Sequence, residues 1–181
     1  MDIGIVFVVI LAIIVLSIII YFIYKQRQED ERQEKIRGMS QMGFTKTKEF
    51  CGLVIDQEHK KWAVVPDVYT TPYIHDFSDL VDFKLVENGV EYKSSGGVTR
   101  ALIGGALFGA AGAVVGASTA SNKQGVSNMY LAIITNDFDR PTEKIVLWNQ
   151  PSSPANGALY NTLVNNANEL IGLLTAIQAN T

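Results

Sequence analysis

The sequence contains a single cysteine, Cys51, and its residues 44–181 show no concentration of positive charge. One thiol cannot form an internal disulfide, so nothing in the chain requires an oxidising compartment. Residues 44–181 carry ten basic and thirteen acidic side chains, whereas a nucleic-acid-binding domain normally shows a concentrated basic surface. We therefore expect no nucleic-acid partner.

Motifs that cradle phosphates are also missing. The glycines follow no G-x-G-x-x-G spacing and no Gly-Lys-Ser/Thr is present, so neither a dinucleotide site nor a P-loop is predicted. Cys51 with His59 or His75 offers a thiol and a base. However, Cys51 begins an apolar stretch, where a buried and inert thiol is expected. The sequence predicts no catalytic or cofactor-binding residues.

One group of polar residues is close in sequence: His75, Asp76, Asp79 and Asp82. These are metal-ligand types, but alternation along a strand directs them to different faces. We expect solvated residues at a strand edge and no metal.

Charge is missing from two runs of 22 residues, and the first is Ile3–Tyr24. It consists largely of Ile, Val, Leu and Phe, and about 20 such residues cross a bilayer as a helix. Tyr21 and Tyr24 lie where an interfacial aromatic belt would fall. No Lys or Arg precedes the run, the run is longer than the apolar part of a signal peptide, and no A-x-A-like site follows it. An uncleaved anchor is therefore favoured over a cleaved signal peptide.

Basic residues gather on the far side of this run: Lys25, Arg27, Arg32, Lys35 and Arg37. The positive-inside bias then predicts a single-pass protein of the cell membrane with its N-terminus outside and its C-terminal domain in the cytoplasm. We divide the chain into an anchor (1–24), a charged helical stalk and linker (25–43) and a main domain (44–181). The stalk helix is expected to end at Gly38.

The main domain shows the alternation and β-branched content of strands. Asn88-Gly89 predicts a two-residue hairpin turn. Trp62 and Trp148 are expected in the core. The predicted strands are Cys51–Asp56, Trp62–Val65, Tyr73–Phe77, Val81–Glu87, Val90–Ser94, Met129–Thr135 and Lys144–Trp148.

A C-terminal helix is predicted from Ser153, as the cap, and Pro154, in the first turn. Its apolar residues recur at spacings of three or four: Leu159, Leu163, Ala167, Leu170, Leu174 and Ile177. Such a stripe favours packing on a sheet. The fold class is α+β, an antiparallel β-barrel or sandwich with one C-terminal helix.

The second uncharged run, within residues 100–122, reads ALIGGALFGAAGAVVGASTASN and is rich in glycine and alanine. Small residues four apart on a helix allow another helix to approach closely. The candidate helix-packing or oligomerisation residues are Ala101, Gly105, Gly109, Gly112, Ala113 and Gly116. Three arrangements stay open: a hairpin against the membrane or another copy, an insert packed on the domain, and a second span. A second span is disfavoured, because it would divide the β-domain across the bilayer.

Three segments resemble small bacterial or phage proteins with a pleckstrin-homology-like (PH-like) domain and a glycine-rich, glycine-zipper-like insert. They are YIHDFSDLVDFKLVENG (73–89), RALIGGALFGAAGAVVGAST (100–119) and MYLAIITND (129–137). The resemblance implies a PH-like barrel or sandwich that carries a helical hairpin insert. It leaves the function open, because such folds serve lipid binding, protein binding and scaffolding.

The function that the sequence favours is that of a non-enzymatic, membrane-anchored PH-like scaffold. It would dock an unidentified protein partner or self-associate as a homo-oligomer at the lipid bilayer through the Gly/Ala hairpin. One alternative is a membrane-active or pore-forming phage exclusion or host-defence factor. A third hypothesis is a sensor of lipid headgroups, with Lys60 and Lys61 as the contacts.

Overall fold

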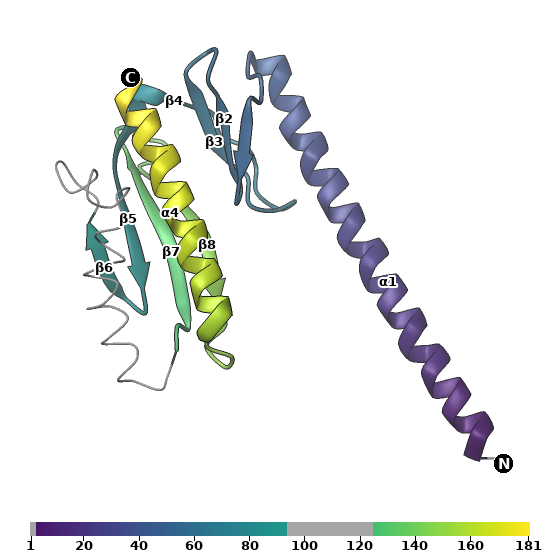
Figure 1. The fold of residues 1–181 in the computed structure, drawn as a ribbon. Helices are drawn as coiled ribbons and strands as arrows, with labels where there is room; N and C mark the ends of the chain where they lie inside the picture. Colours follow the sequence, from purple (N-terminus) through teal and green to yellow (C-terminus); the bar gives the residue numbers. More distant parts are fainter. Residues whose placement is uncertain (1–2, 94–124) are drawn as a thin grey trace.

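A helix of 36 residues, α1 (Ile3–Gly38), begins the chain and projects from the remaining elements (Figure 1). The computed structural model describes residues 3–93 and 125–181. The glycine-rich segment predicted to form a hairpin, with its six helix-packing residues from Ala101 to Gly116, lies outside the described residues.

The first two thirds of α1 are apolar and solvent-exposed. The large side chains from Phe7 to Tyr24 are each about half exposed or more. Among the described residues, this is the one helix that is long and apolar enough to cross a membrane. The helix ends at Gly38, as predicted, and a 3-10 turn, η1 (Met39–Met42), follows it.

In the described residues, eight strands form two antiparallel sheets of four, with strand orders β1-β2-β3-β4 and β6-β5-β7-β8. The first sheet contains β1 (Lys48–Phe50), β2 (Leu53–Asp56), β3 (Lys61–Val64) and β4 (His75–Asp76). The second contains β5 (Leu80–Glu87), β6 (Val90–Lys93), β7 (Asn128–Thr135) and β8 (Thr142–Asn149). A 3-10 turn, η2 (Phe77–Asp79), connects the sheets.

The sheets do not close into a barrel. β4 pairs with β3 through only two residues, and η2 then leads the chain away into β5 of the other sheet. Of the two architectures that the sequence left open, the structure therefore has two separate sheets.

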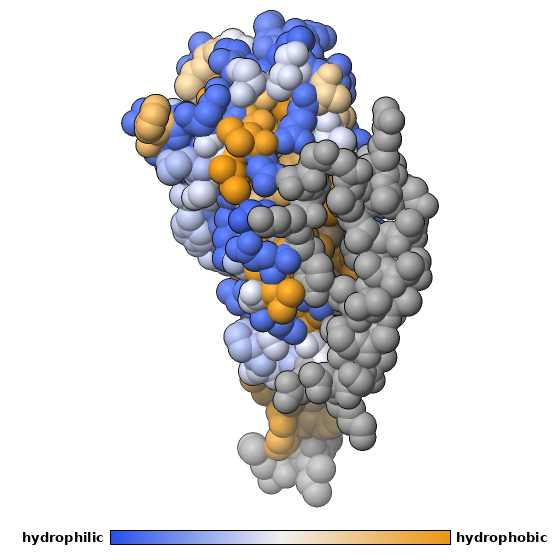
Figure 2. Space-filling model, turned by 90° about the vertical axis from the view of Figure 1, so that its left-hand side faces the viewer, coloured by the Kyte–Doolittle hydropathy of each residue, from blue (hydrophilic) through white to orange (hydrophobic). Residues whose placement is uncertain are grey.

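The C-terminal helix α4 (Gly157–Ala179) packs on the second sheet (Figure 1). Its buried residues are Leu163, Ala167, Leu170, Ile171, Leu174 and Ile177. They join one core with the inner faces of both sheets, which include Trp62, Phe83 and Leu131. Trp148 is partly buried against this core. Where grey atoms do not cover it, the face in Figure 2 shows small apolar groups divided by polar residues.

Some of the predicted secondary structure differs from the structure. β1 was not predicted, and the predicted strand Tyr73–Phe77 is reduced to His75–Asp76. α4 begins at Gly157, with Asn156 as its N-cap, rather than at Pro154 with Ser153 as the cap. The reason is a backbone pair between Val126 and Ala155, with N···O distances of 2.8 and 2.7 Å, because a residue in an extended bridge cannot also start a helix.

Candidate membrane-proximal site

The end of α1 packs on the outer face of the first sheet. Successive strand residues point to opposite faces, so Leu53 and Ile55 enter the main core while Val54 points the other way. On that outer face a second buried cluster consists of Ile36, Met39, Phe44, Val54, Ala63 and Val65. The first sheet is therefore covered on both sides.

Arg32 joins this helix end to the sheet. Its side chain is 7% exposed and its Nε donates a hydrogen bond to the Val65 carbonyl at 2.8 Å. Nη1 pairs with Glu29 at 2.8 Å and Nη2 with Glu49 at 2.5 Å. Burial by itself raises the pKa of Glu49, but hydrogen bonds from Lys46 and Arg32 outweigh it, so the pKa is lowered. The buried guanidinium thus keeps charged partners.

Lys35, about one turn after Arg32 on α1, makes a second contact between the helix and the domain. Its Nζ donates to the Val68 carbonyl and, at 3.2 Å, to the Thr70 carbonyl. Both carbonyls belong to the loop that connects β3 with β4. The same loop is braced internally by Asp67, whose Oδ1 accepts hydrogen bonds from the Tyr69 and Thr70 amides. The loop is thereby held along α1.

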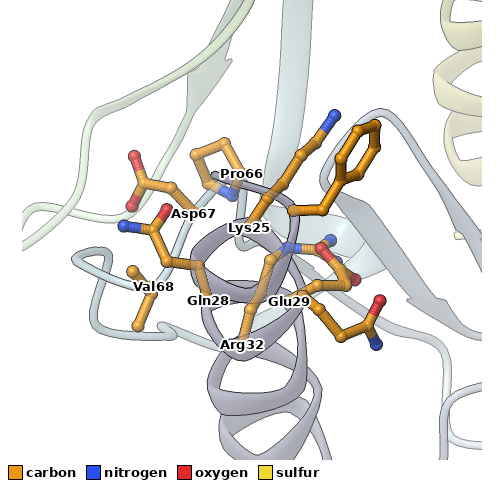
Figure 3. Close-up of a pocket in the computed structure, with 9 residues that line it drawn as sticks. Lys25, Gln28, Glu29, Arg32, Pro66, Asp67 and Val68 are labelled. Atoms are coloured by element: carbon orange, nitrogen blue, oxygen red, sulfur yellow. The ribbon is translucent and has the colours of Figure 1, made fainter. Parts of the chain in front are cut away.

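A groove of about 440 Å³ lies between α1 and this loop (Figure 3). Figure 3 shows Lys25, Gln28 and Arg32 on the helix facing Pro66 and Val68 on the loop. Its lining residues are Phe22, Lys25, Gln26, Gln28, Glu29, Arg32, Pro66, Asp67 and Val68. The groove starts where the apolar run of α1 ends, which makes it the part of the domain nearest to that run.

Lys60 and Lys61 lie at the other end of β3. The β2–β3 turn is held by Asp56, a fully buried carboxylate that accepts from the Thr45 amide at 2.6 Å and from the His59 ring at 2.7 Å. Thr45 follows the end of α1, so this turn lies beyond Gly38, while Val65 lies beside Arg32. The two lysines therefore sit at the end of the sheet opposite to the groove, and their contact with lipid stays a prediction.

The other polar residues singled out in the sequence are dispersed. Cys51 is exposed in the β1–β2 turn, so the expected buried position is wrong. Partial burial, and secondarily Glu169, raise the pKa of its thiol, which disfavours the nucleophilic thiolate. Within the described ranges, no three or more His, Cys, Asp or Glu side chains are grouped to hold a metal.

His75 is fully buried, which corrects the expectation of a solvated residue. It pairs with Trp62 across β3 and β4, and the two rings stack with centroids 4.4 Å apart. Its Nε2 lies 3.4 Å from Glu143, and its Nδ1 has no hydrogen-bond partner among the described residues. The neighbouring Tyr73 donates to Asp137, and this bond raises the pKa of Tyr73 to about 12.

The flanks of the glycine-rich segment are tied to the second sheet. Asn88 of the β5–β6 turn accepts from the Ser127 amide at 2.9 Å and donates to the Gly125 carbonyl at 3.2 Å. Gly125 has φ +61°, and a Cβ there would lie 2.8 Å from the Ala155 oxygen. The sequence identified Asn88 as a turn residue but missed this second role, which depends on a residue 37 positions away.

A comparison with protein families matches residues 40–149 to the glycine zipper containing PH domain. The match covers more than half of the chain, so the protein belongs to this family of PH-like domains that carry a glycine zipper. The resemblance to a PH-like domain with a glycine zipper is thereby confirmed. Comparisons with curated proteins and with solved structures gave no significant match. The apolar part of α1 and the whole of α4 lie outside the matched residues.

Replacing Arg32 with Met should destabilise the protein by about 2 kcal/mol, because the Val65 carbonyl loses its donor and Glu49 loses the Arg32 guanidinium while it keeps Lys46. Denaturant unfolding of the full chain in detergent, followed by tryptophan fluorescence, measures this. Arg27→Met is the matched control, since the Arg27–Glu31 pair is exposed and should contribute at most about 0.5 kcal/mol. Equal losses in the two variants would contradict the role given to Arg32.

Asp56→Asn should destabilise the protein near neutral pH and progressively less in acid. Burial raises the pKa of Asp56, but hydrogen bonds from Thr45 and His59 lower it further, so the folded pKa lies below the unfolded one. The charge therefore stabilises the fold above pH about 4, and this contribution is lost as the pH falls through the folded pKa. Unfolding free energies between pH 7 and pH 3 measure it. Glu34→Gln, at an exposed position of α1, should show no comparable change, and a gap that is constant with pH would refute the prediction.

Proposed function

We propose that this protein is a non-enzymatic scaffold, anchored in the cell membrane by a single pass of residues 1–24. Its PH-like domain, residues 44–181, would lie in the cytoplasm and dock a partner protein or a second copy. The contact would use the Gly/Ala segment, with Ala101, Gly105, Gly109, Gly112, Ala113 and Gly116 as its packing residues.

The observation that carries this proposal is the continuity of α1. The exposed apolar residues and the buried Ile36 belong to one uninterrupted helix. A domain attached in this way keeps a fixed direction relative to its anchor, which suits a module that presents one face at a membrane. PH-like domains are typically binding modules, and the family match supports this class.

The position of the flanks supports the role of the Gly/Ala segment. Gly125 and Val126 precede β7 and lie beside the β5–β6 turn. In Figure 1 this end of the second sheet lies on the side toward which the N-terminal half of α1 extends. The C-terminal flank of the segment is thus attached to the end of the domain that faces the proposed bilayer, whereas its N-terminal flank follows Lys93, which pairs with Lys84 within β5. Its small residues at four-residue spacing suit close helix packing there.

Gly105→Leu combined with Gly109→Leu should reduce crosslinked oligomers of the membrane-embedded protein about tenfold, because overpacking a close helix contact costs on the order of 1–3 kcal/mol. Gel analysis after chemical crosslinking measures the oligomer distribution. The control is Gly104→Leu with Ala111→Leu, which adds only one methyl group less and, on the expected helix, would fall on the face of Phe108. An unchanged distribution in the first variant would remove self-association from the proposal. Dye leakage on expression of the wild type would instead favour a pore-forming protein.

The orientation can be read at Cys51, which is the only cysteine of the chain and is exposed. A membrane-impermeant maleimide at mildly alkaline pH should label it only after the cells are permeabilised. A Cys51→Ser, Thr181→Cys variant should behave identically, because both ends of the domain are expected in the cytoplasm. Labelling of intact cells at either position would contradict the proposed topology.

A further inference from the structure

The groove between α1 and the β3–β4 loop lies at the level where the proposed membrane would end. Tyr24 is the last residue of the apolar run, and Gln28 lies one helical turn further, about 6 Å along the axis. The Gln28 side chain donates to the Tyr24 hydroxyl at 2.5 Å and to the Tyr69 hydroxyl at 3.3 Å. Tyr69, on the loop, is therefore at the height of Tyr24, on the helix.

Tyr69 has the character of an interfacial residue. Its side chain is 77% exposed although the loop that carries it is well braced. Tyrosine is enriched at membrane–water interfaces because its ring is apolar and its hydroxyl is polar. With Tyr21 and Tyr24 on α1, it extends the aromatic belt from the helix to the domain.

Among the charged residues that line the groove, one cation is free to bind an anionic ligand. Arg32 is occupied by Glu29, Glu49 and the Val65 carbonyl. Asp67 is occupied by the amides of its own loop; burial raises its pKa, but these bonds outweigh it and the pKa is lowered. Lys25 has no ion pair among the described residues, and it lies on the same wall as Phe22. One free ammonium beside an apolar surface matches one phosphate ester attached to a lipid.

We propose that this groove seats the headgroup of a phospholipid from the bilayer that α1 crosses, with its phosphate at Lys25 and with Tyr69 in the interface. This rests on the proposed membrane anchor. The apolar groups of Phe22, Pro66 and Val68 then contact the glycerol end of the lipid. The groove is continuous with the apolar surface of α1, which selects a membrane lipid over a soluble phosphate. The domain is consequently held against the membrane by its β3–β4 loop.

The position of the β3–β4 loop relative to the membrane surface tests this proposal. It is measured in the full-length protein, reconstituted in vesicles of phosphatidylethanolamine and phosphatidylglycerol. In a Cys51→Ser background, nitroxide labels are placed at Tyr21→Cys, Tyr69→Cys and Glu58→Cys, the last in the exposed turn at the opposite end of the sheet. Accessibility to a water-soluble nickel complex should be several-fold lower at position 69 than at position 58.

The reference label at position 21 distinguishes failure of the headgroup site from failure of the membrane anchor. If position 21 is shielded while position 69 is as accessible as position 58, the anchor stands and the headgroup site is overturned. If position 21 is accessible as well, the anchor fails and the headgroup site falls with it.

A second measurement tests Lys25. A photoreactive benzophenone side chain at Val68 should form phospholipid adducts in the same vesicles, detected by mass spectrometry. Lys25→Gln should lower their yield about fivefold, the effect of removing one lysine close to an anionic surface. Lys144→Gln removes the same charge on β8 of the second sheet, outside the residues that line the groove, and should leave the yield unchanged. Equal yields in the two variants, or the absence of lipid adducts, would overturn the proposal.

Discussion

The Arg32 guanidinium, hydrogen-bonded to the Val65 carbonyl and paired with Glu29 and Glu49, joins α1 to the first sheet. Burying a guanidinium costs free energy unless its N–H groups have hydrogen-bond or ion-pair partners. Arg32 has such partners on the helix, on β1 and after β3. Its geometry therefore sets where the helix crosses the sheet. Ile36 and Met39 then fill the outer face of the sheet, one turn and two turns further along. Together these contacts set the direction of the apolar run of α1 relative to the domain.

The first sheet needs this helix. Its strands contain between two and four residues, too few to stabilise a sheet through pairing alone. Burial on both faces compensates, with the main core on one side and the α1 cluster on the other. The arrangement also gives the sheet two unlike ends. The end with the β3–β4 loop lies beside the apolar run, and the end with Lys60 and Lys61 lies beyond Gly38. Packing thereby decides which loop lies beside the apolar run of α1.

Much of the fold could be predicted from local pattern. Asn88-Gly89 forms the expected hairpin turn, with both residues at positive φ, and the helix ends at Gly38. The wrong predictions for His75 and Cys51 share a cause. His75 lies in a polar stretch, yet stacking on Trp62 buries it, and Cys51 adjoins an apolar strand, yet it occupies a turn. The spacing of residues along the chain does not predict which side chain a cross-strand neighbour buries or which residue occupies a turn. The candidate packing residues from Ala101 to Gly116 stay predictions, supported at the level of the family.

The sequence by itself determined the features that depend on neighbouring residues: the apolar run of α1, the alternating strands, the turn at Asn88-Gly89 and the apolar stripe of α4. Hydrophobic periodicity and turn chemistry act over a few residues, which is why they can be read directly. Only the tertiary structure decided which loop lies beside the helix. Arg32 meets Val65 across 33 positions and Gln28 meets Tyr69 across 41. These contacts exist because the first sheet is buried on both faces, against the α1 cluster on one side and against the main core, which includes α4, on the other. No pattern of neighbouring residues encodes this arrangement.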